Sequence, residues 1–433
     1  MIKVGLISLG CAKNLVDSEM MLGMVQKGGL EIVQSPEDAD LIIINTCGFI
    51  EEAKKESLAT IKEMHGYHKK LIVAGCYAER YKTNLEREMP FIDRVVTLKD
   101  YPHFGDIIKN VMHDDSLKFG PMDYQNRVLA TSNVSPYLKI SDGCDNRCTY
   151  CAIPLIRGGF RSRSFEDVIK EAELLVKNGA KEINIISQDT TRFGSDYSEN
   201  HLSLLPQLIK RISEIDGVIM VRVLYLYPDE ITTQLLEEIQ SNPKVAKYFD
   251  IPIQHISTSI LRRMNRRGNK EDITLLFNKI RTMMPNAILR TTLIVGFPGE
   301  TENDFEELKT FVSEQEFDRL GVFTYSKEED TPAYLFEDQI DEAIKINRLD
   351  QIMKIQKHIA AKKNRAQIGS IHHTIIEAYD ETSHFYYGRS YAFAPDDIDG
   401  YIVFQSNKPL EIGDDVLVKI TSNYGYDLIG DTV

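Results

Sequence analysis

The sequence contains six cysteines, and their spacing is its strongest chemical signal. Three of them form a Cys-x3-Cys-x2-Cys arrangement, and we call Cys144, Cys148 and Cys151 the clustered set. Three thiolates this close together can hold three corners of a cubane 4Fe–4S cluster, which usually takes four cysteines. The spacing therefore predicts a cluster with one iron open to a further ligand.

Cysteines also serve as zinc ligands, disulfide partners and buried apolar residues. Structural zinc sites normally take four ligands in Cys-x2-Cys pairs, and no histidine or fourth cysteine lies near the clustered set. The N-terminus lacks the basic segment and long apolar core of an export signal, so we expect a cytoplasmic chain with reduced thiols. Scattered core thiols are a common alternative, but three cysteines in so short a segment argue against it.

The other three cysteines, Cys11, Cys47 and Cys76, each follow a short apolar run, and we call them the dispersed set. The runs are Ile7–Gly10, Ile43–Thr46 and Ile72–Gly75. Because the carboxyl ends of parallel strands lie at one edge of a sheet, the three thiols can converge there. We expect them to present three thiolates to one ligand.

Residues 1–120 alternate short apolar runs with helical patterns, which is typical of βαβ units and a parallel sheet. Strands are predicted at Lys3–Leu9, Leu41–Asn45, Leu71–Ala74 and Arg94–Val96. Helices are predicted at Val16–Gln26, Ile50–Met64 and Tyr101–Val111. The polar segment 115–133 is predicted to be a linker.

A second alternating series follows this linker. Its predicted strands are Tyr137–Ile140, Ile183–Ser187, Met220–Leu224, Tyr248–Ile251, Ile288–Val295 and Leu320–Phe323. Helical patterns lie between them, for example Phe165–Lys177, Leu202–Ile212 and Glu302–Ser313. This rhythm predicts a complete or partial α/β barrel. The clustered set follows its first strand, at the end of the barrel where active sites form.

The C-terminal part of the chain changes character after a long helical pattern over Asp341–Gln367. Short β-rich runs are predicted at Thr374–Ala378, Tyr401–Phe404 and Val416–Ile420. The glycines that separate them are Gly388, Gly400, Gly413, Gly425 and Gly430. These features predict a small all-β barrel. The predicted fold class is therefore α/β, with domains at 1–120, 130–366 and 369–433.

Composition and charge limit the classes of protein and partner. The chain has 433 residues and a formal net charge of −14, with 42% hydrophobic residues, which excludes collagen-like and wholly disordered proteins. No apolar run is long enough for a membrane helix. From Gly369 onward, eleven acidic and three basic residues give a charge of −8. Because nucleic-acid affinity depends on neutralising phosphate charge, this favours a basic protein partner over RNA. Solubilising charge is the alternative.

The whole pattern resembles one family. Cys-x3-Cys-x2-Cys with an aromatic residue, Tyr150, before its last cysteine resembles the radical S-adenosylmethionine superfamily. The preceding three-cysteine domain and the trailing β-domain, similar to a TRAM domain, indicate its methylthiotransferases. The resemblance covers essentially the whole chain. Ser8–Glu19, Lys139–Gly143 and Ile186–Thr191 are similar to the branch that modifies a ribosomal protein, whereas the tRNA-modifying branch has Gln-Met-Asn after the first cysteine.

The resemblance implies two 4Fe–4S clusters. The clustered set would hold the radical cluster and the dispersed set an auxiliary cluster that carries the sulfur to be transferred. S-adenosylmethionine would supply both the methyl group and the radical. The product would be a methylthio group on the β-carbon of an aspartate in the decoding-centre protein of the small ribosomal subunit.

Partners and alternatives follow from the same resemblance. A low-potential electron donor such as flavodoxin or ferredoxin is expected, the sulfur donor is not identified, and the protein is expected to be a monomer without membrane attachment. One alternative is the same chemistry on a tRNA adenosine. Another is a non-catalytic iron–sulfur electron carrier, which would leave the barrel unexplained.

Candidate contacts with S-adenosylmethionine also follow from the resemblance. Tyr150 would pack on the adenine, and Gly296 would allow close approach of the adenosine. Arg290 has the fork geometry that suits the carboxylate, with Arg222 as the alternative. The segment that would hold the methionyl amine is Ser187, Gln188 and Asp189, although a polar strand-to-loop junction is the other interpretation.

Two further features have open interpretations. His255 ends a predicted strand and is either a site residue or a core histidine. The basic run Arg262–Arg267 could contact nucleic acid, but a solvated helix end is favoured.

Overall fold

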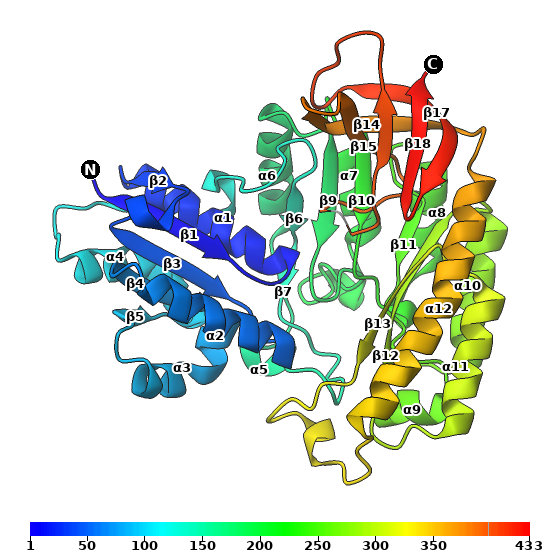
Figure 1. The fold of residues 1–433 in the computed structure, drawn as a ribbon, viewed down its shortest axis with the longest axis horizontal. Coiled ribbons are helices and arrows are strands. Elements are labelled where there is room, and N and C mark those ends of the chain that lie inside the picture. The colour runs from blue at the N-terminus through cyan, green and yellow to red at the C-terminus, as the bar shows by residue number, and fades with distance from the viewer. Residues whose placement is uncertain (397) are drawn as a thin grey trace. The chain divides into compact units, whose positions relative to one another are not determined.

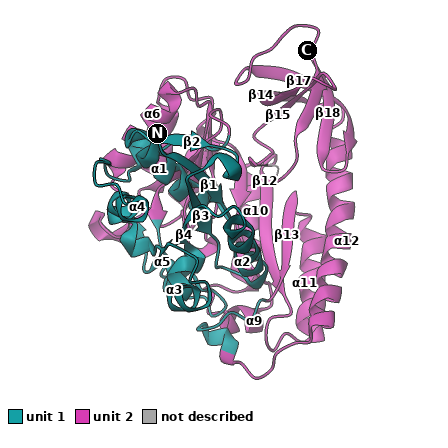
Figure 2. Cartoon of the chain, turned by 60° about the vertical axis from the view of Figure 1, so that its left-hand side comes forward, with its two compact units in different colours: residues 1–131, 142–161, 326–334 teal, residues 132–141, 162–325, 335–433 magenta. Residues whose placement is uncertain are grey.

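The computed structural model describes residues 1–396 and 398–433, so Asp397 of the acidic C-terminal segment lies outside the described residues. The chain forms two compact units, coloured separately in Figure 2. Unit 1 contains residues 1–131, 142–161 and 326–334, and unit 2 contains residues 132–141, 162–325 and 335–433. A compact unit is defined by contacts and can contain more than one folding domain, so the three predicted domain ranges stay a prediction.

Unit 1 is built on a five-stranded parallel sheet in the order β2-β1-β3-β4-β5. Figure 1 shows this sheet in blue. The strands are β1 (Lys3–Ser8), β2 (Glu31–Val33), β3 (Leu41–Thr46), β4 (Lys70–Gly75) and β5 (Arg94–Val95). Strand β3 is buried along its whole length, because helices cover both faces of the sheet.

Alternation along the strands distributes apolar side chains to two cores. Ile72 and Ala74 of β4 pack with helices α1 (Ala12–Lys27) and α4 (Phe104–Met112). Leu71 and Val73 face the opposite way and pack with α2 (Glu51–His65) and α3 (Cys76–Glu88). The predicted parallel α/β fold is confirmed, while β2 and α3 were not predicted.

The remaining elements of unit 1 are short. They are η1 (Pro36–Asp38), η2 (Leu98–His103), η3 (Tyr124–Asn126) and α5 (Ile153–Arg157). The paired two-residue strands β7 (Ser141–Asp142) and β8 (Arg161–Ser162) lie where the chain passes between the units.

In the α/β part of unit 2, six of the described strands form two parallel groups, β10-β9-β6 and β11-β12-β13. A parallel bridge between Val221 and Val245 joins the groups, supported by the Ala246 amide, which donates to the Val221 carbonyl at 2.9 Å. The strands are β6 (Tyr137–Lys139), β9 (Glu182–Ile186), β10 (Met220–Val223), β11 (Tyr248–Asp250), β12 (Ile288–Val295) and β13 (Arg319–Thr324). The predicted partial barrel is confirmed.

Helices accompany these strands in unit 2. They are α6 (Phe165–Lys177), η4 (Glu199–His201), α7 (Leu205–Ser213), η5 (Pro228–Glu230), α8 (Thr233–Ser241), α9 (Thr258–Arg263), α10 (Lys270–Met283), α11 (Glu302–Gln315), η6 (Pro332–Leu335, which begins in unit 1) and α12 (Glu342–Ala366). The long α12 ends three residues before Gly369, close to the predicted limit. No helix in the described chain is both long enough and apolar enough to span a bilayer.

The C-terminal segment closes into a five-stranded barrel in the order β14-β15-β16-β18-β17. Its strands are β14 (Ile371–Asp380), β15 (Phe385–Arg389), β16 (Ile402–Gln405), β17 (Asp415–Tyr424) and β18 (Asp427–Thr432). The all-β prediction is confirmed, but β15 and β18 were missed. Their glycines, Gly388 and Gly430, lie inside the strands instead of in turns. A Cβ on Gly388 would lie 2.6 Å from Thr374 Cγ2, so close strand packing requires this glycine.

Candidate functional site

The dispersed set lies at one edge of the parallel sheet in unit 1. Cys11 is the N-cap residue of α1 just after β1, Cys47 follows β3, and Cys76 is the first residue of α3 after β4. Strands β1, β3 and β4 are neighbours in the sheet. The three thiols therefore come from adjacent strand ends, as the sequence predicted.

Two glycines allow the three cysteine loops to approach one another. Gly10 has a φ of +90°, and a Cβ at this position would lie 2.8 Å from Cys47 Sγ. A Cβ on Gly48 would lie 2.8 Å from the backbone of Tyr77, the residue after Cys76. Larger residues at either position would push the loops apart.

Buried polar side chains hold these loops in place. The Asn14 amide donates to the carbonyls of Leu9, Asn45 and Thr46 at 2.7, 3.2 and 3.3 Å. The Ser57 hydroxyl accepts from the Cys47 amide at 3.1 Å and donates to the Cys47 carbonyl at 2.8 Å. These positioning residues were not predicted, because nothing in the local sequence shows that Asn14 faces three separate carbonyls.

The thiols of the dispersed set have different environments. Cys47 and Cys76 are buried, and burial raises the pKa of Cys47 to about 12 and also raises that of Cys76. Cys11 is accessible to solvent but closely surrounded by protein. Against the effect of desolvation, the charges of Lys13 and Arg157 lower its pKa. Cys76 and Cys11 also contribute to raising the pKa of Cys47, and Cys11 contributes to raising that of Cys76, which places the three thiols within electrostatic range.

The clustered set lies on one loop, whose conformation is held by backbone hydrogen bonds. The Cys144 amide donates to the Gly158 carbonyl at 3.2 Å, and the Cys151 amide donates to the Cys148 carbonyl at 3.0 Å. Gly143 has a φ of +76°, and a Cβ there would lie 2.1 Å from the Gly159 carbonyl oxygen. The loop therefore needs a glycine before its first cysteine.

Both cysteine sets belong to unit 1. Cys76 packs with Ala152 and Ile156, which follow the clustered set, and with Leu98. Tyr150 is half-buried in the same loop. The chain therefore brings the segment of the clustered set against one member of the dispersed set.

The ligand types of the two sets limit what each set can hold. In the described residues, no three His, Cys, Asp or Glu side chains are arranged to hold one metal ion. The ligands of a four-iron cube surround a larger object, so their sulfurs stand farther apart than those around one ion. Each set offers three thiols, and cysteine thiolates are the usual ligands of iron–sulfur clusters. The charges of Lys13 and Arg157 lower the pKa of Cys11 in the dispersed set.

The predicted amine-binding segment follows β9 in unit 2. The Ser187 side chain is buried and its hydroxyl lies 2.5 Å from that of Ser141. Asp189 is 1% exposed and accepts from the Thr191 hydroxyl. Gln188, between them, is half-buried. All three positions lie beyond the carboxyl end of a barrel strand, the end at which the active sites of such barrels form.

The two arginine candidates differ sharply. Arg222 is fully buried, with Nε donating to Glu182 at 2.7 Å and its terminal nitrogens donating to the carbonyls of Tyr391 and Ser390. Because each nitrogen already has a partner, the geometry argues against Arg222 as a cofactor ligand. The Arg290 side chain is 22% exposed and its ion pair with Asp250 is long, at 3.8 Å, so its guanidinium can donate to a further carboxylate.

A structural reason explains Gly296. Its φ is +71°, and a Cβ there would lie 2.2 Å from Cγ of Lys345 on α12. Its amide and that of Phe297 donate to the Glu300 carboxylate. Backbone conformation and packing therefore already require this glycine, and the expected role beside an adenosine stays a prediction.

His255 and the basic run Arg262–Arg267 have structural surroundings. His255 is fully buried, its Nδ1 accepts from the Ser257 amide at 3.0 Å, and burial lowers its pKa to about 3, as for a core histidine. Arg263 donates to Asp338 at 2.7 Å, and Arg267 pairs with Asp229 at 2.7 Å. Two of the four arginines in the run are thus paired with carboxylates, which disfavours an RNA contact.

The acidic residues of the C-terminal barrel are not all surface charges. Asp399 is 4% exposed and accepts from the Tyr248 hydroxyl at 2.5 Å, so it stabilises the fold and cannot meet a partner. Glu377 pairs with the buried Arg389, which also binds Glu182. Asp396, Asp414 and Asp415 are exposed.

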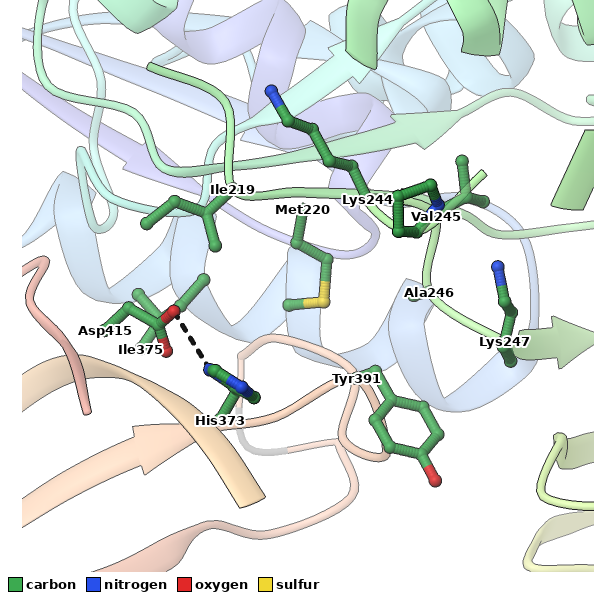
Figure 3. A pocket seen from close by; sticks show the side chains of 11 residues that line it. Ile219, Met220, Lys244, Val245, Ala246, Lys247, His373, Ile375, Tyr391 and Asp415 are labelled. Carbon is green, nitrogen blue, oxygen red and sulfur yellow. Dashed lines mark hydrogen bonds and ion pairs between the residues drawn. The ribbon is translucent and has the colours of Figure 1, made fainter. Parts of the chain in front are cut away.

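A separate cavity of about 360 Å³ lies in unit 2 (Figure 3). Its walls include Met220 and Tyr391, and the His373 ring pairs with Asp415 at 3.3 Å at one side. None of the predicted site residues lines it. The cavity therefore belongs to the junction of the two barrels and not to the candidate site.

Three family models match successive parts of the chain. Residues 3–97 match the uncharacterized protein family UPF0004, residues 138–312 match the radical SAM superfamily, and residues 368–433 match the TRAM domain. Among solved structures, the radical S-adenosylmethionine methyltransferase TsrM from Kitasatospora setae has a TM-score of 0.56 at 12% identity. The match covers 86% of this chain and 76% of TsrM, and it supports the fold alone.

Curated relatives match over their full length. The ribosomal protein uS12 methylthiotransferase RimO of Acetivibrio thermocellus is 48% identical, over 100% of this chain and 98% of the relative. That of Thermoanaerobacter sp. is 45% identical over 99% of both chains. Together with the two cysteine sets, the radical SAM match and the C-terminal TRAM barrel, this similarity is decisive. The chain belongs to the family of the ribosomal protein uS12 methylthiotransferase RimO.

Proposed function

We propose that this chain is a radical S-adenosylmethionine methylthiotransferase that adds a methylthio group to the β-carbon of an aspartate in ribosomal protein uS12. The observation that carries the proposal is the pair of three-thiol sets in one compact unit, in a chain similar to RimO over its full length. An electron carrier would need the clusters but not the barrel with its polar strand ends.

Each cysteine set has a distinct role in this proposal. The clustered set would hold the 4Fe–4S cluster that binds S-adenosylmethionine, and the dispersed set would hold a second 4Fe–4S cluster. When bound, the first supplies radical chemistry and the second carries the sulfur for transfer. Gly143 keeps one loop closed, and Asn14 keeps the strand ends of the other set together.

Five residues are proposed to bind S-adenosylmethionine. Arg290 would pair with the carboxylate, Tyr150 would pack on the adenine, and the amine would bind at the Ser187–Asp189 segment, including Gln188. An electron donor such as flavodoxin or ferredoxin, a cytoplasmic location and a monomeric state complete the proposal.

Mass spectrometry tests the substrate directly. Ribosomal proteins and tRNA nucleosides are compared between a strain with this gene and one that lacks it. Loss of a methylthio mass from uS12, with tRNA unchanged, supports the proposal. Loss of a methylthio-adenosine instead would move the function to the tRNA-modifying branch, and no change in either would favour an electron carrier.

The partner surface has its own test. Replacing the exposed Asp396, Asp414 and Asp415 by Asn should weaken binding to uS12, and more at low salt, because the charges attract a basic protein and are screened over about 8 Å at 0.15 M. Titrations at two salt concentrations measure this, with tRNA as the competing ligand. Unchanged affinity for uS12 would exclude electrostatic docking at this barrel.

A further inference from the structure

One buried arginine contacts both cysteine-bearing parts of unit 1. Arg157 is the last residue of α5, and its side chain is 2% exposed. Its guanidinium donates to the Asp17 carboxylate at 2.8 Å and to the Asp142 carboxylate at 3.2 Å. It also donates to Asn14 Oδ1 at 3.3 Å and to Cys76 Sγ at 3.5 Å.

The partners of Arg157 come from two sides. Asn14 and Asp17 lie on α1, directly after Cys11, and Cys76 begins α3. Asp142 instead precedes the loop of the clustered set. The Arg157 guanidinium thus binds the elements that carry the dispersed set. Arg157 itself belongs to the segment that carries the clustered set.

Charge balance alone does not account for this arrangement. The Asp17 carboxylate is 4% exposed and at 2.8 Å would by itself neutralise a buried guanidinium. The additional contact with a sulfur atom places a donor and a positive charge where the dispersed set must carry negative charge. Hydrogen bonds to ligand sulfurs and the net charge around a cluster set its reduction potential.

We propose that Arg157 is a positioning residue for the dispersed set, which donates to the Cys76 sulfur and stabilises the reduced, more negative state of the cluster held there. The inference rests on the proposed function, because it assumes that the dispersed set holds an iron–sulfur cluster. Packing of Ile156 and Ala152 against Cys76 fixes the guanidinium in this place. Asp17 and Asp142 orient its fork, as bidentate and charge-assisted bonds do.

The experiment isolates one cluster in the full-length chain. In a background with the clustered set replaced by Ala, iron can bind only at the dispersed set. Arg157→Gln, Arg157→Lys and the control Arg161→Gln are reconstituted without oxygen in this background. Arg161 lies on the same segment but is exposed, and in the described structure its guanidinium donates to the backbone carbonyls of Gly159 and Arg157 and not to a cysteine. A redox titration followed by electron paramagnetic resonance measures the potential, and a chelator measures the rate of iron loss.

We expect Arg157→Gln to shift the potential to more negative values and to speed iron loss several-fold. Arg157→Lys should restore most of the potential, since the charge remains, but not iron retention, since a lysine lacks the planar fork. Arg161→Gln should match the parent. A purely structural role would change iron retention without moving the potential of the cluster that remains.

Two outcomes would overturn the inference. One is an unchanged potential in Arg157→Gln with the cluster bound. The second outcome applies if Arg157→Gln binds no iron. In that case, an Arg157→Lys protein with the same cluster potential and the same rate of iron loss as the parent would overturn the inference. Failure of the proposed function is recognised separately: the parent background would bind no iron at the dispersed set, or uS12 would carry no methylthio mass.

Discussion

The two cysteine sets reach the same composition, three thiols each, by different routes. The clustered set lies on one loop, closed by the backbone contact between Cys144 and Gly158. The dispersed set is assembled from the ends of three neighbouring strands and depends on residues that lie far apart in the sequence. A local set depends mainly on the conformation of its own loop, whereas a dispersed set depends on the whole sheet.

The largest expected effects come from removing one set at a time. Replacing the clustered set by Ala should lower iron from about eight to about four per chain and abolish cleavage of S-adenosylmethionine. Replacing the dispersed set by Ala should lower iron equally but leave cleavage intact, without sulfur attachment. Metal analysis and product chromatography measure both. Stoichiometric zinc, or loss of cleavage in a dispersed-set variant that keeps its other cluster, would contradict this division.

Glycine substitutions should affect one cysteine set without affecting the other. Gly143→Ala should deplete the cluster of the clustered set, because both its φ of +76° and the nearby Gly159 carbonyl exclude a side chain. Gly10→Ala should deplete only the other cluster, because its Cβ would collide with Cys47. Iron content in each single-set background is the measurement. Gly120→Ala is the control, since its Cβ would meet nothing within 4 Å. Equal losses at both sets from either variant would refute the distinction.

A smaller effect is expected from Asn14→Ala. Three backbone carbonyls at the ends of β1 and β3 would each lose one hydrogen-bond donor, at a cost of about 1–3 kcal/mol in the free energy of unfolding. The dispersed set should then load less iron while the clustered set loads normally. Thermal unfolding and iron analysis test this against Asn110→Ala, an exposed residue of the same unit. An equally stable Asn14→Ala protein would show that the sheet edge does not need this amide.

The smallest effect concerns pH and unit 2, which holds neither set. Burial raises the pKa of Glu300 from an ordinary value of 4.5 to about 7. Between these values the folded chain keeps a proton that the unfolded chain releases, so this residue's contribution to stability is complete below pH 4.5 and is lost as the pH rises through 7. Glu300→Gln should remove that decline. Unfolding of both proteins at several pH values tests it, and parallel pH profiles would contradict it.

Much of the fold was predictable because its signals are local. Apolar runs such as Leu41–Asn45 identified the parallel strands, and the alternation with helical patterns identified both α/β regions. The glycines of the C-terminal barrel misled the prediction, because Gly388 serves close packing inside β15 and not a turn. Strand β18 was missed for the same reason, since a Cβ on Gly430 would lie 2.4 Å from the Lys419 carbonyl oxygen.

The sequence by itself determined the chemistry of the two cysteine sets, since residue type and spacing decide what a loop or a strand end can bind. Only the tertiary structure decided which charged residues are available for function. Arg222 and Arg290 both lie on barrel strands. The guanidinium of Arg222, however, already donates to Glu182 and to a carbonyl of the C-terminal segment. Asp399 likewise turns inward to Tyr248. The contacts of Arg157 with both cysteine-bearing segments were found only in the structure for the same reason. The partners of a buried charge come from segments far apart in the sequence, so no local sequence pattern predicts them.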